Sequence, residues 1–207
     1  MRKFIYLLSF SLYFSSFHTV NAQESYEDLP SNYKERHPIY DYSDKELSNT
    51  DSIPDFASKP NPLKITGTVF LSDGVTPAKD VILFINQADE HGNYELKKHF
   101  KKRYVHHRGW VKTDADGHYT FYTFVPGRDR HSNDLKKIHL AIKPPDEVEY
   151  VGDDFLFEDD PLLKKSCRKR LDENGIDSIL KAVKIENMHV ATKNIILKEN
   201  RNEYAKN

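Results

Sequence analysis

Cysteine is almost absent from this sequence, because Cys167 is the only one among 207 residues. A single thiol excludes an internal disulfide bond and a thiolate metal cluster. The 31 basic and 32 acidic residues nearly balance, so the net charge of −1 indicates no nucleic-acid partner. The sequence also lacks an internal repeat and a glycine-rich phosphate loop. What remains is a chain long enough for one domain with its own core.

The N-terminus is typical of a targeting segment. Arg2 and Lys3 precede an apolar run from Phe4 to Phe17, and small residues then lead to Val20-Asn21-Ala22. We predict a signal peptide over residues 1–22, cleaved after Ala22, and a secreted or periplasmic protein. The run is too short to cross a bilayer, so no integral membrane segment is expected. The alternative interpretation is a buried N-terminal helix.

The rest of the chain divides by composition. Residues 23–62 are polar, contain five prolines and carry tyrosines without a regular period, which is typical of an extended arm. Such an arm is either disordered or held by its tyrosines on the domain or a second subunit. Residues 63–200 are expected to form the domain, and residues 201–207 a C-terminal tail. Cleavage removes two basic and no acidic residues, which changes the formal charge from −1 to −3.

Short β-rich segments separated by turn signals predict an all-β fold, an antiparallel β-sandwich. Residues 81–85 form a continuous apolar run, suited to a strand that is buried on both faces. Asp116-Gly117 predicts a hairpin between strands at 110–113 and 119–122. Residues 177–184 are expected to form one or two helical turns, and residues 193–198 a closing strand.

One ordered set of motifs resembles a known family. Residues 108–127 have the order R-G-x3-T-D-A-D-G-x-Y-x-F-x-T-x2-P-G; Ile138-His139 follows, and then F-x-F-E-x-D-P-L at 155–162. With a Gly-x-Tyr at Gly92–Tyr94, this order is similar to that of the intradiol ring-cleavage dioxygenases, from about Ile65 to about Leu197. The resemblance implies that family's β-sandwich and a non-haem iron(III) held by two tyrosines and two histidines.

Only part of that ligand set is present. The resemblance makes Tyr94 the first tyrosine ligand and His139 the second histidine, whereas Asp129 stands in place of the other tyrosine and Lys137 in place of the other histidine. Tyr94, His139 and Asp129 are therefore the candidate metal ligands, and Asp129 and Lys137 the candidate catalytic residues. Because an ammonium cannot act as a ligand, iron(III) is expected to bind weakly or not at all.

The two replacements also allow an interpretation without a metal. Asp129 and Lys137 carry opposite charges, and a well-placed ion pair can stand in for a lost cation. Lys137 beside a carboxylate could then act as a nucleophile or proton donor. Two functions stay open: an exported dioxygenase-like protein acting on an aromatic diol or related small molecule, and a metal-free binding module of dioxygenase or transthyretin-like descent. The oligomeric state does not follow from one sequence.

Two charged segments have less specific interpretations. His99, His106 and His107 suggest a metal site, but the lysines and arginine around them favour a solvated basic loop. Asp153 and Asp154 belong to an acidic run without the regular alternation of a calcium loop, and a solvated loop is again favoured.

The targeting segment gives a direct prediction. The exported protein should lack residues 1–22 and begin at Gln23, because a charged start, a short apolar core and small residues at −3 and −1 define a signal peptidase site. Intact-mass spectrometry of the protein recovered outside the cytoplasm measures this. A mass that still includes Met1 to Ala22 would contradict it.

Overall fold

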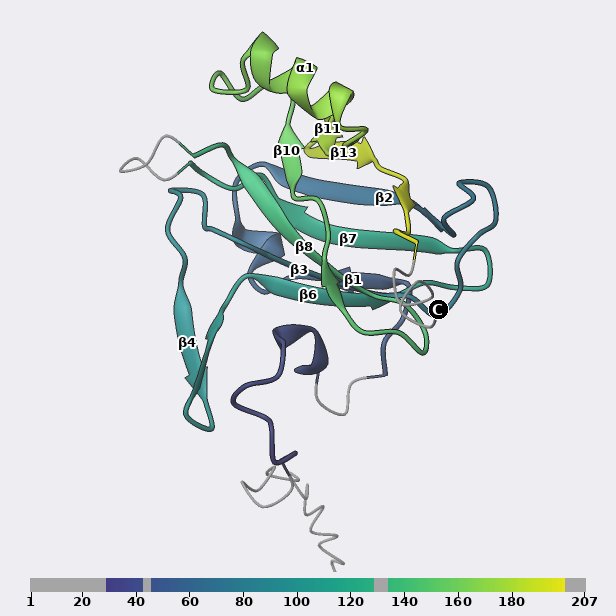
Figure 1. Cartoon of the computed structure of the whole chain (residues 1–207). Coiled ribbons are helices and arrows are strands. Elements are labelled where there is room, and N and C mark those ends of the chain that lie inside the picture. Colours follow the sequence, from purple (N-terminus) through teal and green to yellow (C-terminus); the bar gives the residue numbers. More distant parts are fainter. Residues whose placement is uncertain (1–28, 43–45, 129–133, 200–207) are drawn as a thin grey trace, which may run out of the picture. The chain divides into compact units, whose positions relative to one another are not determined.

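Two six-stranded sheets among the described residues enclose a common core (Figure 1). The computed structural model describes residues 29–42, 46–128 and 134–199. The chain divides into two compact units, Met1–Ser31 and Asn32–Asn207, and the strands and helices of the described residues lie in the second unit.

Alternating burial along β2 (Pro62–Phe70) defines the first sheet. Leu63, Ile65 and Val69 are fully buried, whereas the residues between the buried ones are half exposed. β2 pairs antiparallel with β7 (His118–Phe124). Parallel pairings add short strands: β14 beside β2, β13 beside β2 and β1 beside β7, which gives the order β1-β7-β2-β13-β12. These strands are β1 (Thr50–Ser52), β12 (Val183–Ile185), β13 (Met188–Thr192) and β14 (Ile195–Ile196).

The second sheet is built around β3 (Ile82–Gln87), which lies antiparallel between β6 (Arg108–Lys112) and β8 (Lys137–Lys143). The full order is β11-β10-β8-β3-β6, with β9 paired to β8. The added strands are β9 (Tyr150–Val151), β10 (Phe155–Phe157) and β11 (Ile179–Leu180). A separate hairpin joins β4 (Leu96–His99) to β5 (Lys102–Val105). The expected sandwich with antiparallel central pairings is confirmed, and parallel pairings among the described residues occur only where a short strand is added, at β1–β7, β13–β2, β14–β2 and β10–β11.

The two faces of β3 are both covered, as its apolar sequence predicts. Leu83 and Ile85 pack in the core between the sheets. Phe84 lies on the opposite face with Trp110 and Ala141, and Ile39 from the short helix η2 (Pro38–Tyr40) packs over them. Ile39 is completely buried. Residues before β1 therefore supply part of the second hydrophobic cluster.

Tyrosines of this N-terminal segment make specific contacts. Tyr40 Oη donates to Glu149 Oε2 at 2.5 Å, and burial together with that carboxylate raises the pKa of Tyr40 to about 12. Tyr33 is nearly buried, and Tyr42 packs against the Ile39 cluster. Tyr26 lies outside the described residues.

The turn at Asp116-Gly117 exists, but it does not close a hairpin. Gly117 has φ +71°, and the Asp114 carboxylate accepts hydrogen bonds from the backbone N–H groups of Asp116 and His118. The strands on either side belong to different sheets, β6 to the second and β7 to the first. The hairpin prediction is wrong because turn chemistry fixes the reversal of the chain, whereas the longer pairings with β3 and β2 decide the partners.

The helix prediction is also wrong. Residues 179–180 and 183–185 form β11 and β12, and the α-helix of the described segments is α1 (Lys165–Glu173). This helix is polar and short, with no buried residue, so its sequence lacks the apolar stripe that would have identified it. Within the described segments no helix has the length and apolar character needed to cross a membrane.

Because Ile39 packs on the second sheet, shortening its side chain should cause a large loss of stability. Ile39→Ala should lower the free energy of unfolding by about 2–5 kcal/mol, the usual cost of emptying a buried aliphatic site. The exposed Val148→Ala is the control and should change it by less than about 0.5 kcal/mol. Urea unfolding of the full chain measures both. If Ile39→Ala and Val148→Ala are equally stable, η2 does not contribute to the hydrophobic core of the folded unit.

Candidate functional site

Tyr94 and His139 meet on the outer face of the second sheet. The Tyr94 hydroxyl lies 2.7 Å from His139 Nε2, and the two rings stack with centroids 5.9 Å apart. Tyr94 is 41% exposed, so the pair is accessible from solvent. The structure therefore brings together the tyrosine and the histidine that the sequence analysis singled out, although they are 45 residues apart.

A carboxylate orients the histidine. Asp154 Oδ1 lies 3.1 Å from His139 Nδ1. Because a carboxylate only accepts, Nδ1 carries a proton toward Asp154, and whenever the ring is neutral Nε2 accepts from the Tyr94 hydroxyl. The result is a continuous chain from Asp154 through His139 to Tyr94. Sequence reasoning missed Asp154 and assigned it to a solvated loop, since nothing in an acidic run shows which carboxylate turns toward a ring.

The loop that carries Tyr94 is held by its own backbone contacts. Asp89 accepts hydrogen bonds from the N–H groups of His91 and Asn93, each at 2.8 Å. Burial alone would raise the pKa of the Asp89 carboxyl, but these N–H groups outweigh it and lower that pKa. A side chain at Gly127 would clash, because its Cβ would meet Glu90 O and Gly92 N at 2.5 Å. The Pro126-Gly127 segment thus closes tightly on the Tyr94 loop.

Of the other two predicted site residues, Lys137 is described by the structure and Asp129 is not. Lys137 precedes His139 by two positions on β8, so both side chains leave the same face of the strand. Asp129 lies outside the described residues, and its proposed roles as ligand and catalytic residue stay predictions.

The described residues fit only half of a four-ligand metal site. Donor atoms 2.7 Å apart, as in Tyr94 and His139, can share one ion with bonds of about 2.1 Å. His139 also has the carboxylate partner that commonly fixes a ligating imidazole. Lys137, however, adds an ammonium to the same face where a further ligand is needed. A closed four-ligand iron site does not follow from these residues.

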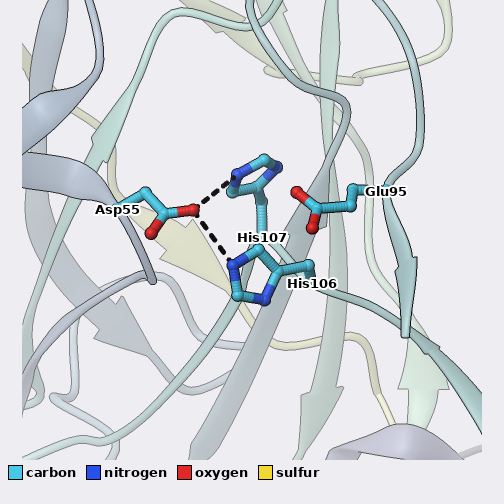
Figure 2. Close-up of side chains that lie close together, drawn as sticks. All are labelled: Asp55, Glu95, His106 and His107. Carbon is cyan, nitrogen blue, oxygen red and sulfur yellow. Dashed lines mark hydrogen bonds and ion pairs between the residues drawn. The ribbon is translucent and has the colours of Figure 1, made fainter. Parts of the chain in front are cut away.

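A second group of polar side chains was not predicted as a unit. Asp55, Glu95, His106 and His107 each offer an atom, and these atoms lie within 4.8 Å of one another (Figure 2). The solvated basic loop expected around the histidines is present at β4, whose residues are exposed, but His107 is fully buried. Local charge predicted solvation for the whole segment, whereas burial of His107 depends on its position opposite Gln87 of β3.

Similarity to solved structures supports the fold. The dioxygenase domain of a dioxygenase–carbohydrate-binding protein fusion from Streptomyces sp. SirexAA-E is 22% identical with a TM-score of 0.56, over 74% of this chain and 91% of that one. An intradiol ring-cleavage dioxygenase from Tetranychus urticae is 17% identical with a TM-score of 0.52, over 76% and 91%. Neither a protein-family model nor a curated protein matches the chain.

A catechol 1,2-dioxygenase from Acinetobacter sp. ADP1, solved with bound mercury, is 15% identical with a TM-score of 0.55. The alignment covers 73% of this chain, which spans only 57% of that enzyme. The protein thus has the fold of the intradiol ring-cleavage dioxygenases.

The exposed geometry of the pair predicts that it contributes little to stability. Tyr94→Phe and His139→Gln should each change the free energy of unfolding by less than about 1 kcal/mol, because a part-exposed hydrogen bond exchanges readily with water. The control is Tyr119→Phe, which removes a buried hydroxyl that donates to Lys193 O at 2.7 Å and should cost about 1–3 kcal/mol. If Tyr94→Phe costs as much as the control in urea unfolding, the pair is structural.

Proposed function

We propose that this protein is an exported intradiol dioxygenase-like protein that binds an aromatic diol or a related small molecule at Tyr94 and His139, with iron held weakly and ring cleavage weak or absent. The observation that carries the proposal is the hydrogen-bonded chain Asp154–His139–Tyr94. It lies at the two positions that the resemblance assigns to iron ligands.

The side chains of Asp154, His139 and Tyr94 can bind a diol without a metal. The Asp154 carboxylate holds the His139 ring in the tautomer whose Nε2 can accept a phenolic proton. The Tyr94 hydroxyl can turn from His139 toward a second oxygen of the ligand, and two neighbouring oxygens would then be bound at once. The ammonium of Lys137 leaves the same face of β8 and would attract a phenolate.

The same ammonium works against iron. Repulsion between Lys137 and a cation at about 4 Å costs about 4 kcal/mol per unit charge at an effective dielectric of 20. Iron(III), when bound, would make a catecholate reactive toward oxygen. Tyr94 and His139 would hold it, with Asp129 as a third ligand that the sequence alone suggests.

The alternative function is a metal-free binding module of the same fold. The direct hydrogen bond favours it, because Tyr94 and His139 satisfy each other without an ion. In that case Lys137 and Asp129 act only on the bound molecule, by charge or proton transfer. The two functions differ in whether iron enters the site at all.

Iron loading and turnover test the proposal. Wild-type protein mixed with iron(III) should show little of the visible absorption that a tyrosinate–iron bond produces, and little cleavage of catechol or protocatechuate. Lys137→His should gain iron and that absorption band, since it restores an imidazole and removes a positive charge. His139→Ala and Tyr94→Phe in the Lys137→His background should abolish the band.

Two results would contradict the proposal. Robust turnover by wild-type protein with one bound iron per chain would show a complete dioxygenase site. If calorimetry of the metal-free protein detects no catechol binding, or detects binding that is the same in His139→Ala, then Tyr94 and His139 do not form a diol site.

A further inference from the structure

Three separate parts of the fold bring together the second polar group, the Asp55 cluster, which consists of Asp55, Glu95, His106 and His107 (Figure 2). Asp55 precedes the short helix η3 (Phe56–Ser58), Glu95 precedes β4, and the two histidines connect β5 to β6. Two imidazoles and two carboxylates therefore converge from segments up to 52 positions apart along the chain, from residue 55 to residue 107. Local sequence does not force this arrangement.

His107 is the member of the Asp55 cluster that needs a partner. Its side chain is completely buried, and neither ring nitrogen makes a hydrogen bond to a described residue. Nε2 lies 3.5 Å from Asp55 Oδ2, but without hydrogen-bond geometry. Phe124 packs edge-on against the ring with centroids 5.0 Å apart, which fixes its orientation. A buried polar atom without a partner destabilises the folded state, so native proteins rarely leave one unless an ion or water completes it.

The protonation states suit a ligand set. Burial, and then the positive charge of Lys59, lowers the pKa of His107, which keeps the ring neutral and its nitrogen lone pair available. Burial tends to raise the pKa of Asp55, but the hydrogen bond from His106 and the positive charge of Lys59 help to outweigh it, and that pKa is lowered. Asp55 is therefore a carboxylate at neutral pH.

The Asp55 side chain points toward the histidines and does not cap the helix that follows it. It occupies the position before η3, where an aspartate commonly caps the helix, yet its side chain makes no cap hydrogen bond. Instead Oδ2 lies 3.0 Å from His106 Nε2 and 3.5 Å from His107 Nε2. Figure 2 shows this carboxylate turned toward both rings, with Glu95 on the other side of them.

Lys97 is the ammonium in direct contact with His106 and Glu95 of the cluster. Its Nζ lies 3.1 Å from His106 Nε2 and 3.4 Å from Glu95 Oε1. His106 Nε2 thus has a carboxylate and an ammonium as neighbours, and one ring nitrogen cannot donate to the first and accept from the second at once. These two contacts of His106 Nε2 are therefore incompatible. A metal ion that displaces the Lys97 ammonium removes the incompatibility, because the imidazole and the carboxylate can then both donate electron pairs to the metal.

We propose that Asp55, Glu95, His106 and His107 bind a divalent transition-metal ion, Zn²⁺ by preference, at a site separate from the Tyr94–His139 pair. Two nitrogens and two carboxylate oxygens match four-coordinate zinc, whereas calcium and magnesium take oxygen ligands and copper(I) takes sulfur. Ligands of a tetrahedral ion with bonds of about 2.1 Å lie about 3.4 Å apart, so the present spread of up to 4.8 Å must close on binding.

The ion would act as a structural clamp. Four protein ligands leave no open position, which is the mark of a structural rather than a catalytic zinc site. The clamp joins the segment before η3 to the start of β4 and to the β5–β6 connection. Glu95 directly follows Tyr94, so zinc would also fix the backbone beside the proposed diol site. Binding of zinc itself does not depend on the function proposed for Tyr94 and His139.

Zinc titration of the chelator-treated full chain tests this site. Wild-type protein should bind one Zn²⁺ per chain in a competition assay with a metal indicator, and its melting temperature should rise with zinc. His106→Gln and Glu95→Gln should each weaken binding by at least about tenfold to a hundredfold. Lys97→Met should instead tighten it, because the competing ammonium is gone.

Control variants outside the Asp55 cluster distinguish zinc bound at this site from zinc bound adventitiously elsewhere on the protein. His99→Gln and Lys98→Met lie in the same hairpin outside the cluster and should leave zinc affinity unchanged, as should His139→Ala. Failure of wild-type protein to bind zinc, or binding that ignores His106→Gln and Glu95→Gln, would overturn the proposal. Loss of binding in His139→Ala alone would place the ion at the diol site and also overturn it.

Discussion

The antiparallel register across β8, β3 and β6 fixes the direction of one histidine in each of the two sites, His139 on β8 and His107 beside β3. Ile85 lies beside Gly109 and Leu140, and the next residue, Asn86, lies beside Arg108 and His139. Because direction alternates along a strand, Ile85 faces the core and Asn86 faces outward. A shift of one residue would exchange the two sets, burying His139 and expelling the core residues.

This alternation separates the two sites by face. On the inner face, Gln87 Nε2 donates to Phe124 O and its Oε1 accepts from Thr123, and the neighbouring His107 packs on the Phe124 ring. On the outer face, His139 is free to meet Tyr94 and Asp154. A buried histidine held by an aromatic ring suits a fixed ligand, whereas a part-exposed histidine with an orienting carboxylate suits a molecule that arrives from solvent.

The sequence could predict features that depend on strand periodicity and motif order. The run at 81–85 identified a strand buried on both faces, and the motif order identified the fold and brought Tyr94 and His139 into one hypothesis. Features that depend on which distant segments meet could not be predicted. Asp116-Gly117 specifies a turn, but not that its strands join different sheets. His107 and Asp154 sit in charged runs, and only the fold shows that one is buried and the other reaches a ring.

Anomalous diffraction from crystals grown with zinc and iron together would test the separation of the two sites most directly. We expect a zinc-edge peak about 2.1 Å from atoms of Asp55, Glu95, His106 and His107, and no fully occupied iron-edge peak at Tyr94 and His139. Fully occupied iron bound by Tyr94 and His139, with no metal at the Asp55 cluster, would contradict it.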